Sequence, residues 1–442
     1  MREPADPARA DLDRADLDRD GLGLGDDLRS FVDASPSPSH AVAEIVRRLT
    51  AAGFGALDET DAWSLAPGDT RYVVRDSSSV IAFRVGTAPP AEAGLRLVGA
   101  HTDSPTFKVR PRWDLRRYGY RLVGVEPYGG LLAHTWLDRE LTVAGRLVVR
   151  GGGQHLVVLP GGPLRLPSLA IHLDRSVRDG LVLDPQRQLV PLWGPDLETG
   201  PGLLQALADA AGVVAGDIVG HDLVLADTQP AARTGADGTW IAAPRLDDLG
   251  CCHSGTLALL RAAGAAHTQV LVANDHEEVG SGSAQGARGS FLADVLARLV
   301  AATGEVDVQA LHRTIARSRL VSADMAHAVH PNFADRHEPS HAPAMGGGPV
   351  LKLNANQSYA TDAVTGGWFT ERCADAGVPV QHFVSRADLP CGSTIGPLTA
   401  TRLGIATVDV GAPMLAMHSC REVASALDVP LMVRALTACL EQ

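Results

Sequence analysis

Segments with the apolar period of β-strands alternate with segments of helical period in the first and last parts of this chain, and this alternation constrains the fold most strongly. The strand-like runs lie at 72–74, 80–85, 95–100, 270–273, 319–322 and 405–410. Helical spacing of apolar residues marks 40–52 and 255–265. Strands that alternate with helices pack in layers, so the sequence predicts an α/β fold.

The middle of the chain has a different pattern. From about Phe107 to Thr239, short alternating segments such as 141–149 are separated by glycine and proline turns, which is typical of a β-rich domain. The 442 residues are too many for one ordinary core and enough for two domains. We therefore expect a discontinuous α/β domain over 28–106 and 243–442, interrupted by an inserted β-rich domain over 107–242.

Residues 1–27 are expected to form a disordered acidic tail, because they combine low hydrophobicity with alternating charge. They contain the near-repeat ADLDR at 10–14 and 15–19, which is a compositional bias rather than a core-forming pattern. We expect ordered structure to begin near Leu28.

Composition argues against several classes of protein. The 39 basic and 51 acidic residues give a net charge of −12, whereas nucleic-acid binding needs a basic face. No apolar stretch approaches the ~18 residues that cross a bilayer, and the polar N-terminus is unlike a secretory signal. The six cysteines lack CxxC spacing and are expected to be free thiols. We therefore expect a cytoplasmic protein without nucleic-acid or membrane partners.

Two adjacent carboxylates, Glu277 and Glu278, follow the apolar run 270–273 and precede the Gly/Ser-rich run 280–283. Such pairs usually lie on charged helix surfaces, but this position predicts the end of a buried strand, where open α/β sheets carry their sites. Neighbouring carboxylates repel each other, and a cation relieves that repulsion. We expect one Glu to bind a metal and its neighbour to take a proton from the attacking water.

Ligand-type residues also stand where other predicted strands end. With the Glu pair, the segments are 101–103, 245–248, 277–278, 322–325 and 416–419. They offer two imidazoles and several carboxylates and need no thiolate, which suits zinc, cobalt or manganese in a hydrolytic site. A single strand-end His or Asp is usually structural, whereas five such segments on one sheet edge predict a metal site.

Four longer motifs then make the chain recognisable. They are GAHTDSP at 99–105, DHEEVGS at 275–281, SADMAHA at 322–328 and PCGSTIGP at 390–397. With them, the chain resembles the M18 metallo-aminopeptidases, the aspartyl aminopeptidase family of the co-catalytic zinc exopeptidases, from about Phe31 to Ser419. The resemblance implies a zinc-exopeptidase-like α/β/α catalytic domain that removes N-terminal residues from peptides. It also implies two divalent metal ions per subunit. Zinc is the expected metal, and cobalt and manganese are the alternatives.

The resemblance assigns roles to individual residues. It implies five metal ligands, His101, Asp247, Glu278, Asp324 and His418. Asp247 would bridge the two ions. His101 and Asp324 would bind one ion, and Glu278 and His418 would bind the other. Glu277 would be the general base, and Asp103 would orient His101. Asp248 departs from the amide expected in many relatives, and an extra charge there would change metal affinity or metal choice.

The inserted domain also resembles the family, in which it builds homodimers and a tetrahedral dodecamer. Its markers are 128–130, 135–139 and 169–173. His172 would act in the active site of a neighbouring subunit, and the alternative is a core histidine on a strand. Tyr359 matches a residue that contacts the transition state, where a phenol can donate to an oxyanion.

Substrate preference is expected from the wall of the pocket. Lys352 matches a cation that acidic-specific members present to the first side chain of the peptide, with His327 nearby. The resemblance therefore implies a preference for Asp and Glu. A broad aminopeptidase for neutral residues, a deacylase of N-acyl amino acids and an assembly protein with a vestigial site are the alternatives.

Overall fold

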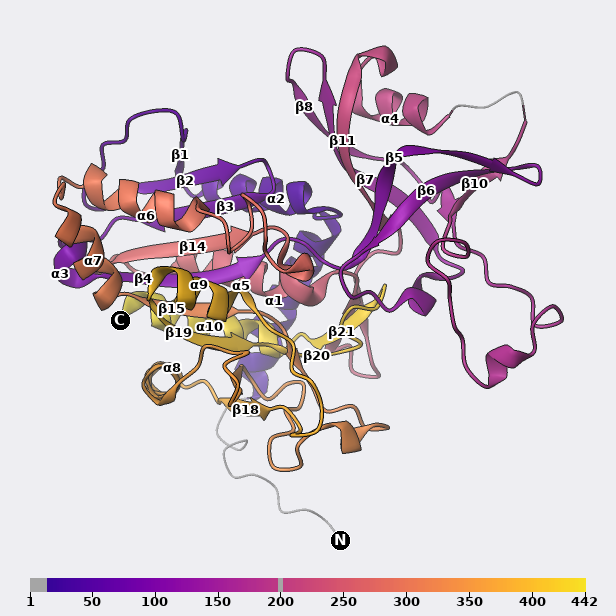
Figure 1. Ribbon diagram of the computed structural model, residues 1–442. Helices are drawn as coiled ribbons and strands as arrows, with labels where there is room; N and C mark the ends of the chain where they lie inside the picture. The colour runs from indigo at the N-terminus through magenta and orange to yellow at the C-terminus, as the bar shows by residue number, and fades with distance from the viewer. Residues whose placement is uncertain (1–13, 198–201) are drawn as a thin grey trace, which may run out of the picture.

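A nine-stranded sheet forms the centre of the larger lobe (Figure 1). In the computed structural model, which describes residues 14–197 and 202–442 and side chains from Leu22 onwards, the strand order is β1-β2-β3-β14-β4-β15-β19-β17-β18. The strands are β1 (Gly55–Leu57), β2 (Thr70–Arg75), β3 (Ser79–Arg84), β4 (Leu95–His101), β14 (Thr268–Asn274), β15 (Arg319–Ala323), β17 (Val350–Leu353), β18 (Gln381–Val384) and β19 (Ala406–Gly411). The central strands β14, β4, β15 and β19 are parallel, as expected for apolar strands buried on both faces.

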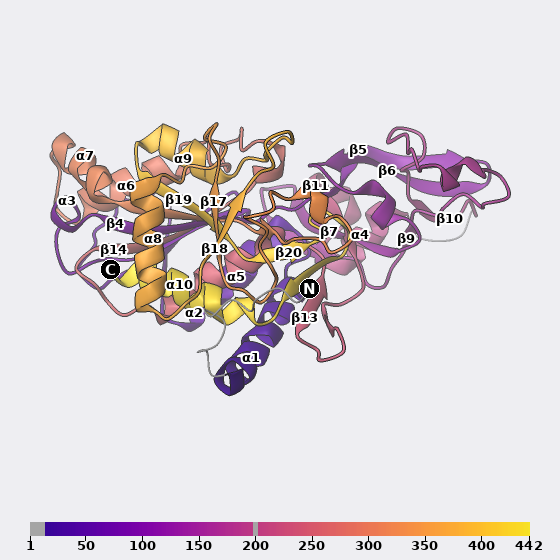
Figure 2. The same ribbon diagram turned by 90° about the horizontal axis from the view of Figure 1, so that it is seen from below.

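Helices cover both faces of this sheet and make three α/β/α layers, which confirms the predicted fold class (Figure 2). One face carries α1 (Arg14–Asp33), α2 (Pro38–Ala51), α5 (Leu246–Arg261), α8 (Ala363–Asp375) and α10 (Asp428–Glu441). The other face carries α3 (Pro90–Ala93), α6 (Phe291–Ala302), α7 (Val308–Arg317) and α9 (Ile395–Leu403). Ser37 accepts the backbone N–H of His40, and Pro38 occupies the first turn of α2, so the SPSPS segment starts this helix.

The smaller lobe is the inserted β-rich region. Its strands are β5 (Thr106–Arg117), β6 (Tyr120–Tyr128), β7 (Glu140–Val149), β8 (Gln154–Val158), β9 (Leu164–Arg165), β10 (Leu192–Pro195) and β11 (Ile218–Asp227). The order is β11-β5-β6-β10-β9-β7-β8, and β11 also pairs with β7, so the sheet closes into a barrel-like ring. A core that includes Phe107, Leu141 and Leu223 fills it, and α4 (Leu203–Ala211) packs against it.

A third, five-stranded sheet joins two strands that follow the ring to three strands from the last part of the chain. It has the order β12-β13-β21-β20-β16. Its strands are β12 (Ala232–Thr234), β13 (Trp240–Ala243), β16 (Ala326–His327), β20 (Pro413–Leu415) and β21 (Glu422–Ser425). Because β13 pairs with β21 of the larger lobe, the ring ends at Asp227 rather than at residue 242. An alternating pattern predicts a strand but does not identify its partner.

The first helix changes the expected limit of the acidic tail. Helix α1 begins at Arg14, so the disorder expected for residues 14–27 is wrong, while residues 1–13 lie outside the described part of the chain. The segment is held by charge: Asp26 pairs with Arg233, and Asp27 pairs with Arg48 at 2.7 Å. The prediction of disorder used low hydrophobicity, which does not report ion pairs of this kind.

Short 3-10 helices complete the secondary structure. They are η2 (Ala133–Trp136), η3 (Ser176–Arg178), η4 (Ala215–Asp217), η5 (Glu277–Val279) and η6 (Ala334–Arg336). Among the helices that the structure describes, each is too short or too polar to cross a membrane.

Candidate active site

The candidate site lies at the carboxyl edge of the central sheet. Strand β4 ends at His101, β14 ends just before the turn with Glu277 and Glu278, and β15 ends just before Asp324. Because β14 and β15 both pair with β4 in parallel register, these three strand ends lie side by side. The motifs therefore share the edge at which open α/β sheets carry their sites.

Two further groups reach this edge from other elements. Asp247 lies at the start of α5, and His418 lies in the turn after β20 with a φ of 66°. All but two of the expected site residues line one cavity of about 340 Å³. They are His101, Asp247, Glu277, Glu278, Asp324, His327, Lys352, Tyr359 and His418. Asp103 lies behind the cavity wall, and His172 lies elsewhere.

Asp247 faces both histidines of the cavity. Its Oδ1 lies 3.4 Å from His101 Nε2, and its Oδ2 lies 3.4 Å from His418 Nε2. Glu278 Oε1 lies 3.3 Å from the same His418 nitrogen. Among the described residues, Asp247 Oδ1 and Glu278 Oε1 are buried without a hydrogen-bond partner. Buried polar atoms normally have one, and these oxygen and imidazole atoms are of the kinds that bind zinc.

The potential ligand atoms fall into three overlapping groups, each within 4.8 Å. The groups are His101, Asp247, Asp248 and Asp324; His101, Glu277 and Glu278; and Asp247, Glu278 and His418. Asp247 belongs to the first and the third group. Its carboxylate is therefore shared by two of the three potential ligand groups.

The electrostatics of the cavity favour a cation. Burial and the neighbouring carboxylates raise the pKa of Glu277 to about 8 and the pKa of Glu278 to about 7. Burial opposes the charged imidazole of His418, but the carboxylates of Asp247 and Glu278 outweigh it and raise its pKa to about 11. A divalent ion would compensate the converging carboxylates, so the residues present fit a metal.

Asp103 is fully buried and holds the turn with the two glutamates. Its Oδ1 accepts the backbone N–H of Glu277 at 3.0 Å, and its Oδ2 accepts that of Glu278 at 3.1 Å. His101 Nδ1 lies 3.1 Å from the backbone oxygen of Asp103 and 3.4 Å from Oδ1. Such contacts fix the orientation of an imidazole and leave Nε2 facing the cavity.

Asp248, the residue at which an amide was expected, lies behind His101. It is fully buried, and its Oδ2 accepts the backbone N–H of His101 at 3.0 Å. Burial, together with the carboxylates of Asp324 and Asp247, raises the pKa of Asp248 well above its usual range. A neutral carboxyl has one donor and one acceptor oxygen, so it resembles the amide more closely than a second charge would.

The wall opposite the glutamates carries a buried cation. Lys352, on β17, is 3% exposed, and its Nζ donates to the backbone oxygen of Met325 at 2.7 Å. The same ammonium lies 3.5 Å from Asp324 Oδ1 and 5.5 Å from the centre of the Tyr359 ring. His327 lines the same wall, and burial and the nearby ammonium lower its pKa to about 4.

Sequence reasoning missed two residues of the site. Glu422 is buried, and its carboxylate accepts the backbone N–H groups of His418 at 2.6 Å and Asp247 at 3.1 Å. Arg288 lines the cavity, and among the described residues its guanidinium has no ion pair or hydrogen bond. The position of Arg288 in the loop after the glutamates was the available signal, whereas nothing near Glu422 in the sequence pointed to a role.

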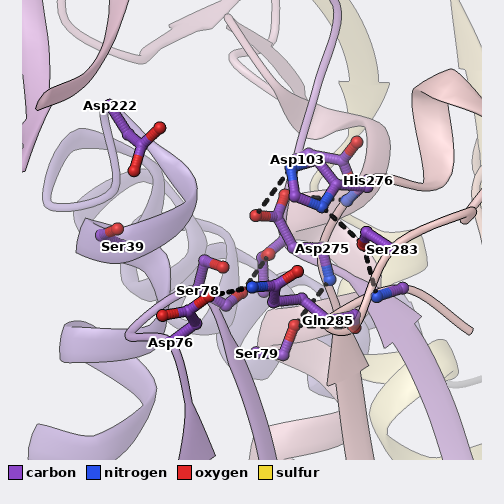
Figure 3. A network of polar contacts seen from close by, with 12 residues as sticks. Ser39, Asp76, Ser78, Ser79, Asp103, Asp222, Asp275, His276, Ser283 and Gln285 are labelled. Atoms are coloured by element: carbon purple, nitrogen blue, oxygen red, sulfur yellow. Dashed lines mark hydrogen bonds and ion pairs between the residues drawn. The ribbon is translucent and has the colours of Figure 1, made fainter. Parts of the chain in front are cut away.

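A polar network supports the other side of the glutamate turn (Figure 3). Ser79 Oγ accepts the backbone N–H of Asp275 at 2.9 Å, and His276 Nδ1 lies 2.8 Å from Ser283 Oγ. Ser283 in turn accepts the backbone N–H of Gly286 at 3.0 Å. The Gly/Ser-rich run after the glutamates therefore folds back on the turn and fixes it.

His172 lies apart from the cavity, in the smaller lobe. It occupies an exposed turn after β9, so the alternative of a core histidine on a strand is excluded. Its neighbours Leu169 and Leu173 are 63% and 75% exposed. Within one chain, the structure does not bring His172 to the other site residues.

Comparison with known proteins agrees with this geometry. The family described as Aminopeptidase I zinc metalloprotease (M18) matches residues 31–439. A probable M18 family aminopeptidase 2 of Pseudomonas aeruginosa is 46% identical over 426 residues, which cover 94% of this chain and 97% of that protein. Both matches extend through the inserted lobe.

Solved structures have the same fold. Ape4, in the cryo-EM structure of its complex with Nbr1, is 37% identical with a TM-score of 0.91, covering 95% of this chain and 85% of that chain. The dodecamer of S. cerevisiae mApe1 is 30% identical with a TM-score of 0.81, covering 94% and 95%. The chain therefore belongs to the M18 family of zinc metallo-aminopeptidases, hydrolases that act on peptides.

Proposed function

We propose that the chain is an aminopeptidase with two divalent ions held by one bridging carboxylate, Asp247. His101 and Asp324 would be the other ligands of one ion, and Glu278 and His418 would be those of the second. The observation that supports this proposal is the position of the two Asp247 oxygens, each 3.4 Å from a different imidazole nitrogen. Nitrogen and oxygen ligands without thiolate suit zinc, with cobalt or manganese as alternatives.

The divalent ions would polarise the scissile carbonyl and acidify the attacking water. Glu277 lies beside them without being needed as a ligand, and Asp103 fixes its backbone. The Glu277 carboxylate takes a proton from the water and passes it to the departing amine. Burial raises the pKa of Tyr359, so the phenol stays protonated and donates to the carbonyl oxygen as that oxygen becomes negative.

We propose a preference for peptides that begin with Asp or Glu. Two cations, Lys352 and Arg288, line the cavity beside the candidate ligands. The Lys352 ammonium already donates to the backbone oxygen of Met325 and pairs with Asp324. The Arg288 guanidinium, in contrast, is unpaired among the described residues. A charge-assisted hydrogen bond to a substrate carboxylate contributes roughly 1.5–3 kcal/mol, which is one to two powers of ten in kcat/KM.

We propose that the subunits assemble through the inserted lobe into dimers and a tetrahedral dodecamer, in which His172 enters the active site of a neighbouring subunit. The lobe exposes large apolar side chains beside His172, including Leu169, Leu173 and Val182, the last at 89% exposure. Apolar side chains gathered in this way mark association surfaces. His172 then helps to stabilise the oxygen that becomes negative during hydrolysis.

One experiment tests the proposed function directly. The metal-free protein is reconstituted with zinc, cobalt or manganese and assayed against a panel of aminoacyl chromogenic substrates and N-acyl amino acids. We expect two ions per chain at full activity and the fastest turnover of Asp and Glu substrates. One ion at full activity would refute the dinuclear site, and turnover of N-acyl amino acids alone would indicate a deacylase.

A further inference from the structure

Tyr128 connects the inserted lobe to the candidate metal site. It is the last residue of β6, and its hydroxyl donates to Asp103 Oδ2 at 2.7 Å. Burial and the neighbouring Asp103 and Asp275 raise the pKa of Tyr128, so the phenol remains a donor. This hydrogen bond is the point at which a side chain of the ring reaches the buried carboxylate behind His101.

The Asp103 carboxylate is shared between the two lobes. From the larger lobe it accepts the N–H groups of Glu277 and Glu278, at 3.0 and 3.1 Å, and its Oδ1 lies 3.4 Å from His101 Nδ1. From the smaller lobe it accepts Tyr128. A carboxylate that receives three donors in a buried position has little freedom to rotate.

The residues that follow Tyr128 continue along the site. A Cβ on Gly129 would lie 3.1 Å from Glu278 Cβ, so the backbone of the ring packs directly on that side chain. The backbone oxygen of Gly130 lies 3.2 Å from His418 Nδ1, and the N–H of Leu132 donates to the His418 oxygen at 2.9 Å. One short segment of the inserted lobe thus touches both Glu278 and His418.

We infer that Tyr128 is a positioning residue, which fixes Asp103 and thereby the imidazole of His101 and the turn of Glu277 and Glu278. The inference rests on the proposed function, in which these side chains bind or serve metal ions. The metal site then keeps its geometry only while the inserted lobe remains packed against the larger lobe. Partners that orient metal ligands in this way typically change metal affinity or activity 10–100-fold when they are removed.

The test removes the hydroxyl of Tyr128 and keeps its aromatic side chain. In Tyr128→Phe, Co²⁺ added to the metal-free protein should bind at least tenfold more weakly, with a changed visible absorption spectrum, since the spectrum reports ligand geometry. The kcat of the loaded enzyme should fall while KM stays within about twofold, because no group that touches substrate is removed. Tyr120→Phe is the matched control, on the same strand but 51% exposed, and should behave as wild type.

A second comparison separates positioning from a general loss of stability. If Tyr128 acts through Asp103, then Asp103→Ala and the double variant with Tyr128→Phe should bind Co²⁺ with the same affinity, since Ala already leaves the Tyr128 hydroxyl without its acceptor. Independent, additive losses would overturn the inference. So would Tyr128→Phe with wild-type Co²⁺ affinity and spectrum. A wild-type protein that binds no Co²⁺ would instead refute the proposed function.

Discussion

At the scale of single residues, the two glutamates of the η5 turn have separate tasks although they are neighbours in sequence. Glu278 lies 3.3 Å from His418 Nε2 and shares a potential ligand group with Asp247, whereas Glu277 belongs only to the group with His101 and Glu278. We therefore expect Glu277→Gln to keep its metal and to lose 10²–10⁴-fold in kcat, since only the proton acceptor is removed. Metal content and kcat, measured on the same sample, check this. A variant that retains more than about a tenth of wild-type kcat would exclude Glu277 as the base.

Asp247→Ala should behave differently, because its two oxygens face two separate imidazoles. Removing a shared ligand should release metal and abolish activity together. Elemental analysis after dialysis should find fewer than two ions per chain, with Asp335→Ala, which removes an exposed carboxylate of the 3-10 helix η6, as control. Two ions at full occupancy in Asp247→Ala would contradict the bridging role.

Lys352→Met should flatten the preference for acidic N-terminal residues. We expect kcat/KM on Asp and Glu substrates to fall by roughly one to two powers of ten, with a smaller change on Leu substrates. Arg288→Gln tests whether the unpaired guanidinium shares this task, and Arg336→Gln, in the exposed 3-10 helix η6, is the control. A wild-type enzyme that cleaves Leu and Asp substrates equally well would show a broad aminopeptidase.

At the scale of elements, apolar periodicity predicted the strands of the central sheet well. Strands β3, β4, β15 and β19 lie within about a residue or two of the expected ranges, and β4 and β15 end at expected ligand motifs. Periodicity could not predict which strands pair. For this reason the sequence predicts an inserted domain that reaches residue 242, whereas β12 and β13 extend the sheet that contains β21.

The candidate site was predictable to the extent that its residues follow strand ends or match family motifs. Tertiary contacts placed the rest. Glu422 meets Asp247, which is distant in sequence, because β21 pairs with β13, and no local sequence pattern predicts that contact. Helix α1 was missed for a related reason, because its acidic residues are paired with Arg48, Arg233 and His253 far along the chain.

Helix α1 supplies a prediction about stability and pH. Hydrogen bonds from His253, and then from Arg48, hold the pKa of Asp27 below its usual range. Such a group stabilises the fold above its unfolded pKa of about 3.9 and loses this contribution as pH falls through its lower folded pKa. Asp27→Asn should therefore destabilise the protein by about 1 kcal/mol at pH 7, since the carboxylate is partly exposed.

Urea unfolding of Asp27→Asn and wild type at several pH values measures this effect. The difference between them should shrink below about pH 4, because the unfolded chain then binds a proton at Asp27 while the folded chain still keeps this carboxylate ionised. Asp61→Asn removes an exposed carboxylate of the same lobe and should match wild type. A difference that stays constant down to pH 3 would show that the contact does not depend on charge.

At the scale of the whole molecule, the proposed role of His172 can be tested by mixing inactive chains. His172→Phe and Glu277→Gln should each be inactive alone, yet oligomers assembled from both should recover activity. In an equal mixture, about a quarter of the sites would combine an intact Glu277 with an intact His172 from a neighbour. Co-expression followed by sedimentation and assay checks this. No recovery in mixed oligomers, or a fully active monomer, would refute action between subunits.

The insertion of the ring between two parts of the larger lobe fixes the order in which a new chain matures. During synthesis His101 appears first, the whole ring of 106–227 follows, and the last candidate ligand, His418, appears long afterwards. Lobes generally fold as they emerge from the ribosome, with earlier parts first. A growing chain therefore contains the whole lobe proposed for self-association before it contains the last candidate ligand, so the peptidase site can be completed only after that lobe has been synthesised.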